Sequence, residues 1–158
     1  MAIGLLLVVF FIVFFYKMSG LIASFSVMWT LILLLGVLAL LEATLTLPGI
    51  AGIILTVGMA VDANVLIFER IKEELKDETN NILAFDGGYT KSRTAIIDAN
   101  ITTLLAAVIL FFMGSGPVKG FAVTLGVGIF TTLFSVYFIA RLFTSLYVTK
   151  NKNSGKLI

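Results

Sequence analysis

The sequence contains no cysteine and no histidine, and only 13% of its 158 residues are charged. The absence of cysteine excludes disulfides and thiolate metal sites. The absence of histidine excludes His-ligated metals, so a carboxylate is the expected proton carrier. We also find no glycine-rich phosphate loop, no nucleophile paired with a base and no basic aromatic surface for nucleic acid. The sequence therefore predicts no enzyme, no metal site and no nucleic-acid partner.

Apolar residues dominate what is present. They make up 59% of the chain, and the mean hydropathy is +1.11. Soluble domains are about 45–50% apolar, and a soluble fold of this length could not bury so much apolar surface. The composition predicts an integral membrane protein that sits in a lipid bilayer.

Five apolar segments have the character of membrane spans. Because a span needs about 20 apolar residues, we expect spans over about 2–16, 21–41, 47–68, 95–113 and 118–147. The first is a few residues short. Tight connections between most of them predict antiparallel neighbours. We therefore predict an all-α, polytopic transmembrane bundle of five helices, a single domain over residues 1–158.

The basic residues predict the orientation of this bundle. Residues 69–93 form the one long connection, which we expect to be a cytoplasmic loop, and residues 148–158 form a polar tail. With that loop in the cytoplasm, every lysine and arginine except Lys119 lies on the cytoplasmic side. Cytoplasmic loops carry an excess of Lys and Arg. We predict an extracytoplasmic amino end and a cytoplasmic carboxy end.

A carboxylate interrupts the apolar run 47–68. Asp62 would cost about 2.5 kcal/mol or more if it faced lipid, so it should face protein or water. Gly58 lies one helical turn earlier on the same face and leaves space for a partner helix or a water. Asn64 is roughly 200° away around the helix and faces a different neighbour. We favour a protonatable site at Asp62 over a static contact between helices, and a structural role for Asn64.

A second copy of this pattern opens the fourth expected span. Residues 97–100 (IDAN) repeat residues 61–64 (VDAN) on a helix that runs the opposite way, so the two pairs could meet across the bundle. Near a helix amino terminus a negative charge gains about 0.3–1 kcal/mol. For Asp98 we therefore favour capping or interface anchoring. The same helix adds three residues to a polar face: Asn100, Thr102 and Thr103.

Small residues recur every four positions in the fifth expected span: Gly120, Thr124, Gly128 and Thr132. Such spacing lets two helix backbones approach closely. We interpret this ladder as helix packing, although a sliding contact would need the same residues. Arg141 follows near the cytoplasmic end, where we expect its side chain to reach the interface rather than pair with a buried acid.

Four ordered segments resemble the SecD family of protein-export translocase subunits: residues 44–52 (TLTLPGIAG), 57–74 (VGMAVDANVLIFERIKEE), 97–104 (IDANITTL) and 114–122 (GSGPVKGFA). The resemblance implies a place in the resistance-nodulation-division (RND) superfamily of proton-driven machines. SecD-like proteins have six spans, with a large external domain between the first two. This chain resembles spans two to six. We therefore expect it to be part of a longer protein that supplies the first span and the external domain.

The same resemblance implies a function in the cytoplasmic (inner) membrane. A SecD-like subunit uses the proton-motive force to assist the translocation of unfolded polypeptides, with protons as coupling ion and no other cofactor. Its partners would be SecF, the SecYEG channel and often YajC. The aspartate of the family's proposed proton pathway matches Asp62, with partners expected largely from SecF. Two alternatives stay open: a scaffold that holds SecF and SecYEG without conducting protons, and an RND-type exporter of lipids or drugs.

Overall fold

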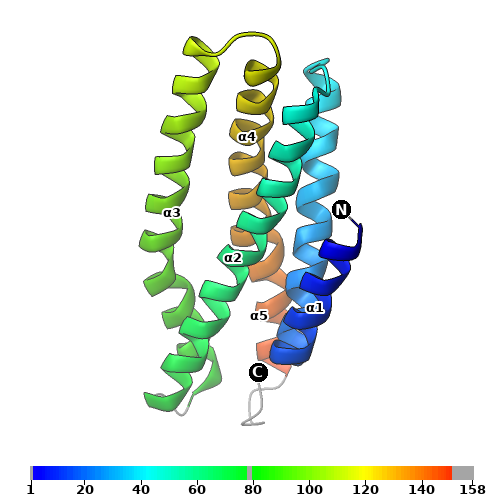
Figure 1. The fold of residues 1–158 in the computed structure, drawn as a ribbon. Helices are drawn as coiled ribbons and strands as arrows, with labels where there is room; N and C mark the ends of the chain where they lie inside the picture. Colours follow the sequence, from blue (N-terminus) through cyan, green and yellow to red (C-terminus); the bar gives the residue numbers. More distant parts are fainter. Residues whose placement is uncertain (1, 78–79, 151–158) are drawn as a thin grey trace.

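The computed structural model describes residues 2–77 and 80–150. Within these ranges the chain is helical apart from short connections and contains no strand, which confirms the all-α class. Figure 1 shows the helices as an upright bundle. The elements follow in the order α1 (Ala2–Leu40), α2 (Leu47–Asp77), α3 (Asn81–Met113), α4 (Pro117–Phe134), the π-helical segment η1 (Ser135–Ala140) and α5 (Arg141–Lys150).

The number of helices differs from the prediction. The described residues contain four helical runs that are long and apolar enough to cross a membrane: Leu6–Leu40, Leu47–Asp77, Asn81–Met113 and Pro117–Lys150. The expected segments 2–16 and 21–41 both belong to α1, so the predicted number of helices is corrected from five to four. The physical reason is that the connection expected between them shrinks to a kink at Lys17, whose φ of 47° and ψ of −115° are not helical.

The two arms of α1 lie side by side, as the dark-blue and light-blue parts of Figure 1 show. A Cβ atom at Gly20 would overlap the backbone of Ile12, so glycine lets the second arm start against the first. Tyr16 of the first arm joins Ala23 and Val27 of the second in the main apolar core. The first arm therefore packs as part of the bundle although it is shorter than the about 20 residues of a full span.

The connection expected over 69–93 is helical in its described residues, except at Asn80. Asn80 caps α3, because its side chain accepts a hydrogen bond of 3.0 Å from the backbone nitrogen of Ile82. Gly88, which falls in the expected loop, lies inside α3 and gives room to α2: a Cβ atom there would overlap Ile71. The charged stretch thus extends two helices instead of forming a loop.

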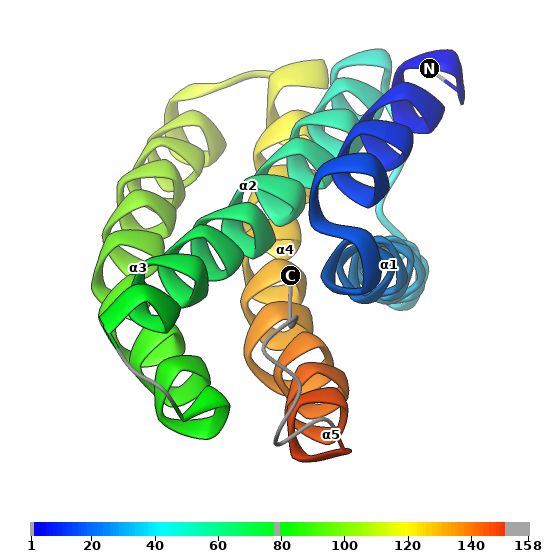
Figure 2. The same cartoon turned by 90° about the horizontal axis from the view of Figure 1, so that it is seen from below.

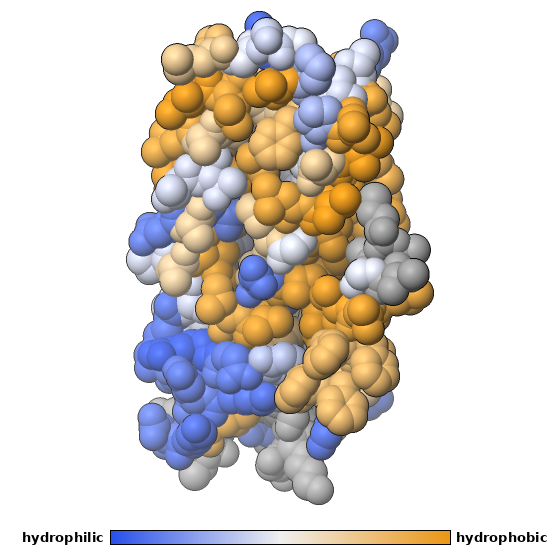
Figure 3. Space-filling view, viewed as in Figure 1, coloured by the Kyte–Doolittle hydropathy of each residue, from blue (hydrophilic) through white to orange (hydrophobic). Residues whose placement is uncertain are grey.

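The expected span 118–147 is divided into α4, η1 and α5, and residues 151–158 of the expected tail lie outside the described residues. Seen from below, α2 crosses the bundle between α3 and α1, with α4 behind it (Figure 2). In Figure 3, apolar residues cover most of the visible surface, and hydrophilic residues gather where α2 ends and α3 begins. Such broad apolar exposure fits a chain that contacts lipid.

Candidate functional site

Asp62 lies on the exposed face of α2. Among the described residues its carboxylate has no hydrogen bond and no ion pair. Gly58, one turn earlier, is exposed as well, and no described atom would lie within 4 Å of a Cβ placed there. Leu55, a further turn back, is 45% exposed. α2 therefore presents Asp62 on a face that the described part of this chain leaves uncovered.

A cavity of about 230 Å³ lies beside Asp62, between α2 and α3. Asn100 and Thr103 of α3 line it together with Asp62, and apolar side chains such as Met59 and Leu66 complete the wall. A water molecule occupies about 30 Å³ of liquid volume, so the cavity has room for several. The structure thus brings the aspartate of the first motif copy close to the asparagine of the second.

The two motif asparagines have the same local geometry. Asn64 donates through Nδ2 to the carbonyl oxygen of Ala60 at 2.8 Å, and Asn100 donates to that of Ile96 at 2.7 Å. Both side chains are buried, and neither Oδ1 has a hydrogen-bond partner among the described residues. A buried acceptor without a donor is costly. At Asn100 this acceptor belongs to a residue that lines the cavity with Asp62.

Asp98 does not share the cavity with Asp62. It is exposed, and it lies far from the amino terminus of α3 at Asn81. Because the helix dipole acts within the first turn, the expected capping role is wrong: the helix starts earlier than the hydropathy suggested. Thr102 and Thr103 donate to the carbonyl oxygens of Asp98 and Ala99 on their own helix, both at 2.9 Å. Of these two threonines, Thr103 is the one that lines the cavity.

The ladder of small residues lies against the other side of α2. Three of its members each lie against one residue on the facing segment: Gly120 against Thr46, Thr124 against Gly52 and Gly128 against Thr56. A Cβ atom at Gly128 would overlap the side chain of Thr56, so glycine is required for this approach. Thr132, the next member, is fully buried, and its hydroxyl has no hydrogen-bond partner among the described residues. This close packing fixes α2 on α4.

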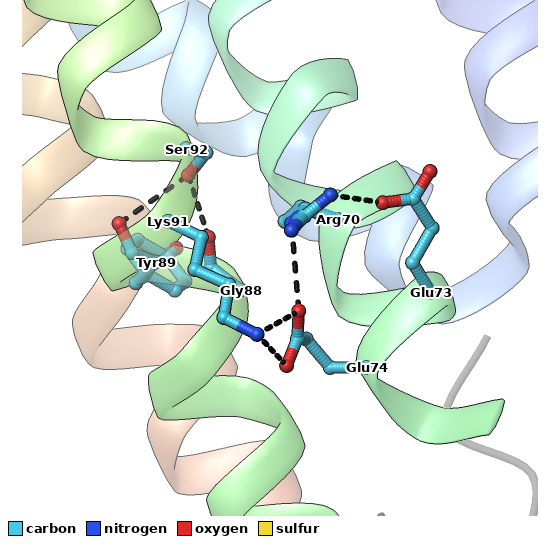
Figure 4. A network of polar contacts seen from close by, with 7 residues as sticks. All are labelled: Arg70, Glu73, Glu74, Gly88, Tyr89, Lys91 and Ser92. Atoms are coloured by element: carbon cyan, nitrogen blue, oxygen red, sulfur yellow. Dashed lines mark hydrogen bonds and ion pairs between the residues drawn. The ribbon is translucent and has the colours of Figure 1, made fainter. Parts of the chain in front are cut away.

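Polar contacts join α2 and α3 at the charged end of the bundle (Figure 4). The Glu74 carboxylate accepts hydrogen bonds of 2.7 and 2.8 Å from Lys91 Nζ and lies 3.4 Å from Arg70 Nε. Glu73 adds a second ion pair to Arg70. Exposed pairs of this kind contribute about 0–1 kcal/mol each. The Arg70 pairs lie within α2, so the Lys91–Glu74 pair is the one that joins the two helices below the level of the cavity.

Two further contacts between distant segments were not foreseen from the sequence. The Tyr16 hydroxyl donates to Glu69 at 2.6 Å and ties the short arm of α1 to α2. Ser135, at the start of η1, donates through Oγ to the carbonyl oxygen of Ser26 at 2.8 Å, and their hydroxyl oxygens lie 3.2 Å apart. No spacing in the sequence signals either pair, because the two partners lie 53 residues apart in the first pair and 109 residues apart in the second.

Residues 1–150 match the family model described as "Protein export membrane protein SecD/SecF, C-terminal". The chain is 55% identical over 139 residues to the protein translocase subunit SecD of Desulfurispirillum indicum, covering 88% of this chain and 27% of the relative. It is 53% identical over 150 residues to that of Magnetococcus marinus, covering 95% of this chain and 28% of the relative. The chain thus spans about a quarter of the length of these curated relatives.

The fold agrees with a solved structure of the same kind. The crystal structure of SecDF from Thermus thermophilus, described as a translocon-associated membrane protein, matches with a TM-score of 0.92 and 43% identity over 96% of this chain and 21% of that one. SecDF in its super-membrane-facing form matches with a TM-score of 0.91. Sequence and fold agree over almost the whole chain, which therefore belongs to the SecD/SecF family of protein-export membrane proteins, as a SecD-type member.

Proposed function

We propose that this chain is the membrane part of a SecD-type translocase subunit that uses the proton-motive force to assist polypeptide translocation. One observation carries the proposal: Asp62 has no partner among the described residues and lines a cavity, together with Asn100 and Thr103, in an apolar helix bundle. The names of the relatives support the link to protein export.

The chemistry of the site suits a proton carrier. A protonated Asp62 is neutral and compatible with an apolar surrounding, whereas the carboxylate needs water or a cation. The cavity provides room for water, and Asn100 provides a buried amide oxygen that lacks a donor. Moving one charge through 100 mV yields about 2.3 kcal/mol, which shifts a two-state equilibrium well over tenfold. Protonation of Asp62 could therefore change how α2 and α3 pack.

Partners and location belong to the same proposal. We infer a multi-pass protein of the cytoplasmic membrane, with an extracytoplasmic amino end, a cytoplasmic carboxy end and the short arm of α1 within the bilayer as a fifth crossing. The uncovered face around Gly58 and Asp62 is where SecF would contribute groups to the proton pathway. SecYEG, and in many organisms YajC, would complete the assembly that acts on the exported polypeptide. Protons are the coupling ion, and no enzymatic step is involved.

Asp62→Asn tests this function in membrane vesicles from cells that produce the protein. We expect normal assembly with SecF and loss of the export that depends on the proton-motive force, because asparagine keeps the shape of the side chain but cannot ionise. Asp98→Asn is the matched control, since Asp98 lies outside the cavity; it should export normally. Full export by Asp62→Asn would refute the proposal.

Co-purification with SecF separates the proton carrier from the scaffold alternative. If Asp62 is a fixed contact to another chain, Asp62→Asn should lower the recovery of SecF together with export. We expect unchanged recovery. An assay of lipid or drug efflux tests the remaining alternative, and we expect no efflux above that of vesicles without the protein.

A further inference from the structure

A cavity larger than the one at Asp62 lies between α3 and the run of α4 and η1. Its volume is about 580 Å³. Two arginines, Arg93 and Arg141, line it together with two tyrosines and two exposed phenylalanines. No acidic side chain belongs to this lining among the described residues. The cavity therefore combines a concentrated positive charge with an apolar wall.

The charge of the cavity is only partly compensated within the described chain. Arg93 has no ion pair or hydrogen bond among the described residues. Arg141 lies 3.2 Å from the carboxylate of Asp86, but these side chains are 51% and 64% exposed. Ion pairs that are exposed to this degree contribute little to stability. Two guanidinium groups at one cavity repel each other unless an anion binds there, and their planar forks match the oxygens of a phosphate.

Two tyrosines that line the same cavity favour the binding of an anion. The Tyr137 hydroxyl is buried and has no hydrogen-bond partner among the described residues, so its proton is available to an acceptor. The ring of Tyr89 is buried, and the guanidinium carbon of Arg141 lies 5.7 Å from its centroid. A cation over an aromatic face is attracted to it, which orients Arg141 at the cavity.

The wall of the cavity selects an amphipathic ligand. Phe134 and Phe138 stack with their ring centroids 4.9 Å apart, yet they are 49% and 66% exposed. A free phosphate would leave these rings uncovered, whereas acyl chains would cover them. The cavity is lined by Tyr89 and Arg93 from the first half of α3, and hydrophilic residues gather where α3 begins (Figure 3). Basic pockets between membrane helices at such an end bind anionic head groups.

We propose that this cavity binds one anionic glycerophospholipid. Its phosphate binds between Arg93 and Arg141 and accepts a hydrogen bond from Tyr137. Its acyl chains lie along Phe134 and Phe138. The residues differ from those at Asp62, so the proposal does not rest on the proposed proton pathway.

Native mass spectrometry of the full chain in a neutral detergent, with phosphatidylglycerol or phosphatidylcholine added, tests the site. We expect about tenfold preference for phosphatidylglycerol, and its loss in Arg93→Gln/Arg141→Gln. Tyr137→Phe keeps the charge and should weaken phosphatidylglycerol binding about two- to fivefold. Lys76→Gln/Lys150→Gln removes two exposed cations outside the cavity and should preserve binding. An equal loss in both double variants would overturn the proposal.

Two further experiments identify the ligand that binds and the place where it binds. Excess glycerol phosphate should not displace the lipid; complete displacement would mean that a free phosphate suffices and would overturn the lipid assignment. Trp29→Phe/Phe138→Trp places the only tryptophan of the chain at the cavity. Brominated phosphatidylglycerol should quench its fluorescence more than brominated phosphatidylcholine does. Equal quenching by both lipids would contradict a site at this cavity.

Discussion

The two sides of α2 differ in how closely their neighbour approaches. Toward α4, glycine and threonine residues let the helix backbones approach closely, and a Cβ atom at Gly128 would overlap the side chain of Thr56. Toward α3, a cavity of about 230 Å³ separates the helices at the level of Asp62. Packed interfaces resist continuous deformation. The contrast indicates that α2 and α4 act as one rigid unit, while the seam between α2 and α3 has room to change.

The seam between α2 and α3 is itself not uniform. At its charged end, Gly88 of α3 packs on Ile71 of α2, and Lys91 binds Glu74. The cavity at Asp62 lies farther from this charged end of the two helices. A change of protonation at Asp62 would therefore act on a seam that is anchored at one end. That arrangement suits a small hinge movement of α3 relative to α2.

Gly128→Ala should have the largest effect on stability. The added methyl group meets Thr56, and overpacking of this kind costs typically about 1–3 kcal/mol. Gly126→Ala is the matched control, because no described atom lies within 4 Å of a Cβ placed there. Unfolding in mixed detergent micelles measures both. Equal stability of the two variants would contradict the tight contact between α2 and α4.

Asn100→Leu should have an intermediate effect, seen in export rather than in stability. Removing a buried amide whose oxygen lacks a partner is close to neutral for folding. Loss of one hydrogen-bonding group at the cavity should lower export driven by the proton-motive force about two- to tenfold.

Asn64→Leu is the control for Asn100→Leu, because Asn64 has the same local bond and the same unpaired oxygen but does not line the cavity. The two variants should unfold alike and differ in export. If Asn64→Leu lowers export as much as Asn100→Leu does, the cavity has no special role.

Glu74→Gln should have the smallest effect. Its partners Arg70 and Lys91 are 42% and 53% exposed, so water can solvate them when the carboxylate is gone. We expect a loss of less than about 1 kcal/mol, which decreases further with added salt. Unfolding at low and high salt measures it. A loss of several kcal/mol would show that the anchored end of the seam depends on charge rather than on the contact between Gly88 and Ile71.

The sequence predicted the parts of this molecule that follow from hydropathy. The helical class follows from the length of the apolar runs, and Asp62 attracts attention because a carboxylate is expensive among them. The reversal at Lys17 falls in the tight connection expected between the first two spans, but its restriction to a single non-helical residue, which leaves both arms in one helix, was not predicted. The helical conformation of Gly88, in the expected loop, was not predicted either, because its contact with Ile71 joins two helices and leaves no local pattern.

Other parts of the site depend on where helices begin and which faces meet. The expected capping role of Asp98 failed because α3 begins at Asn81, inside a charged stretch that hydropathy assigns to a loop. The antiparallel copies of the motif did suggest a meeting of the two pairs, but only the structure shows Asn100 rather than Asp98 at the cavity of Asp62. Arg93 and Arg141 share a cavity that no local pattern indicates.

Infrared difference spectroscopy of the protein in lipid tests the central claim most directly. Acidification should produce the carbonyl stretch of a protonated carboxyl group at Asp62. The account predicts that this band is absent in Asp62→Asn, shifts in Asn100→Leu and is unchanged in Asn64→Leu, since of the two asparagines only Asn100 lines the cavity. A spectrum that Asp62→Asn leaves unchanged would contradict a protonatable Asp62.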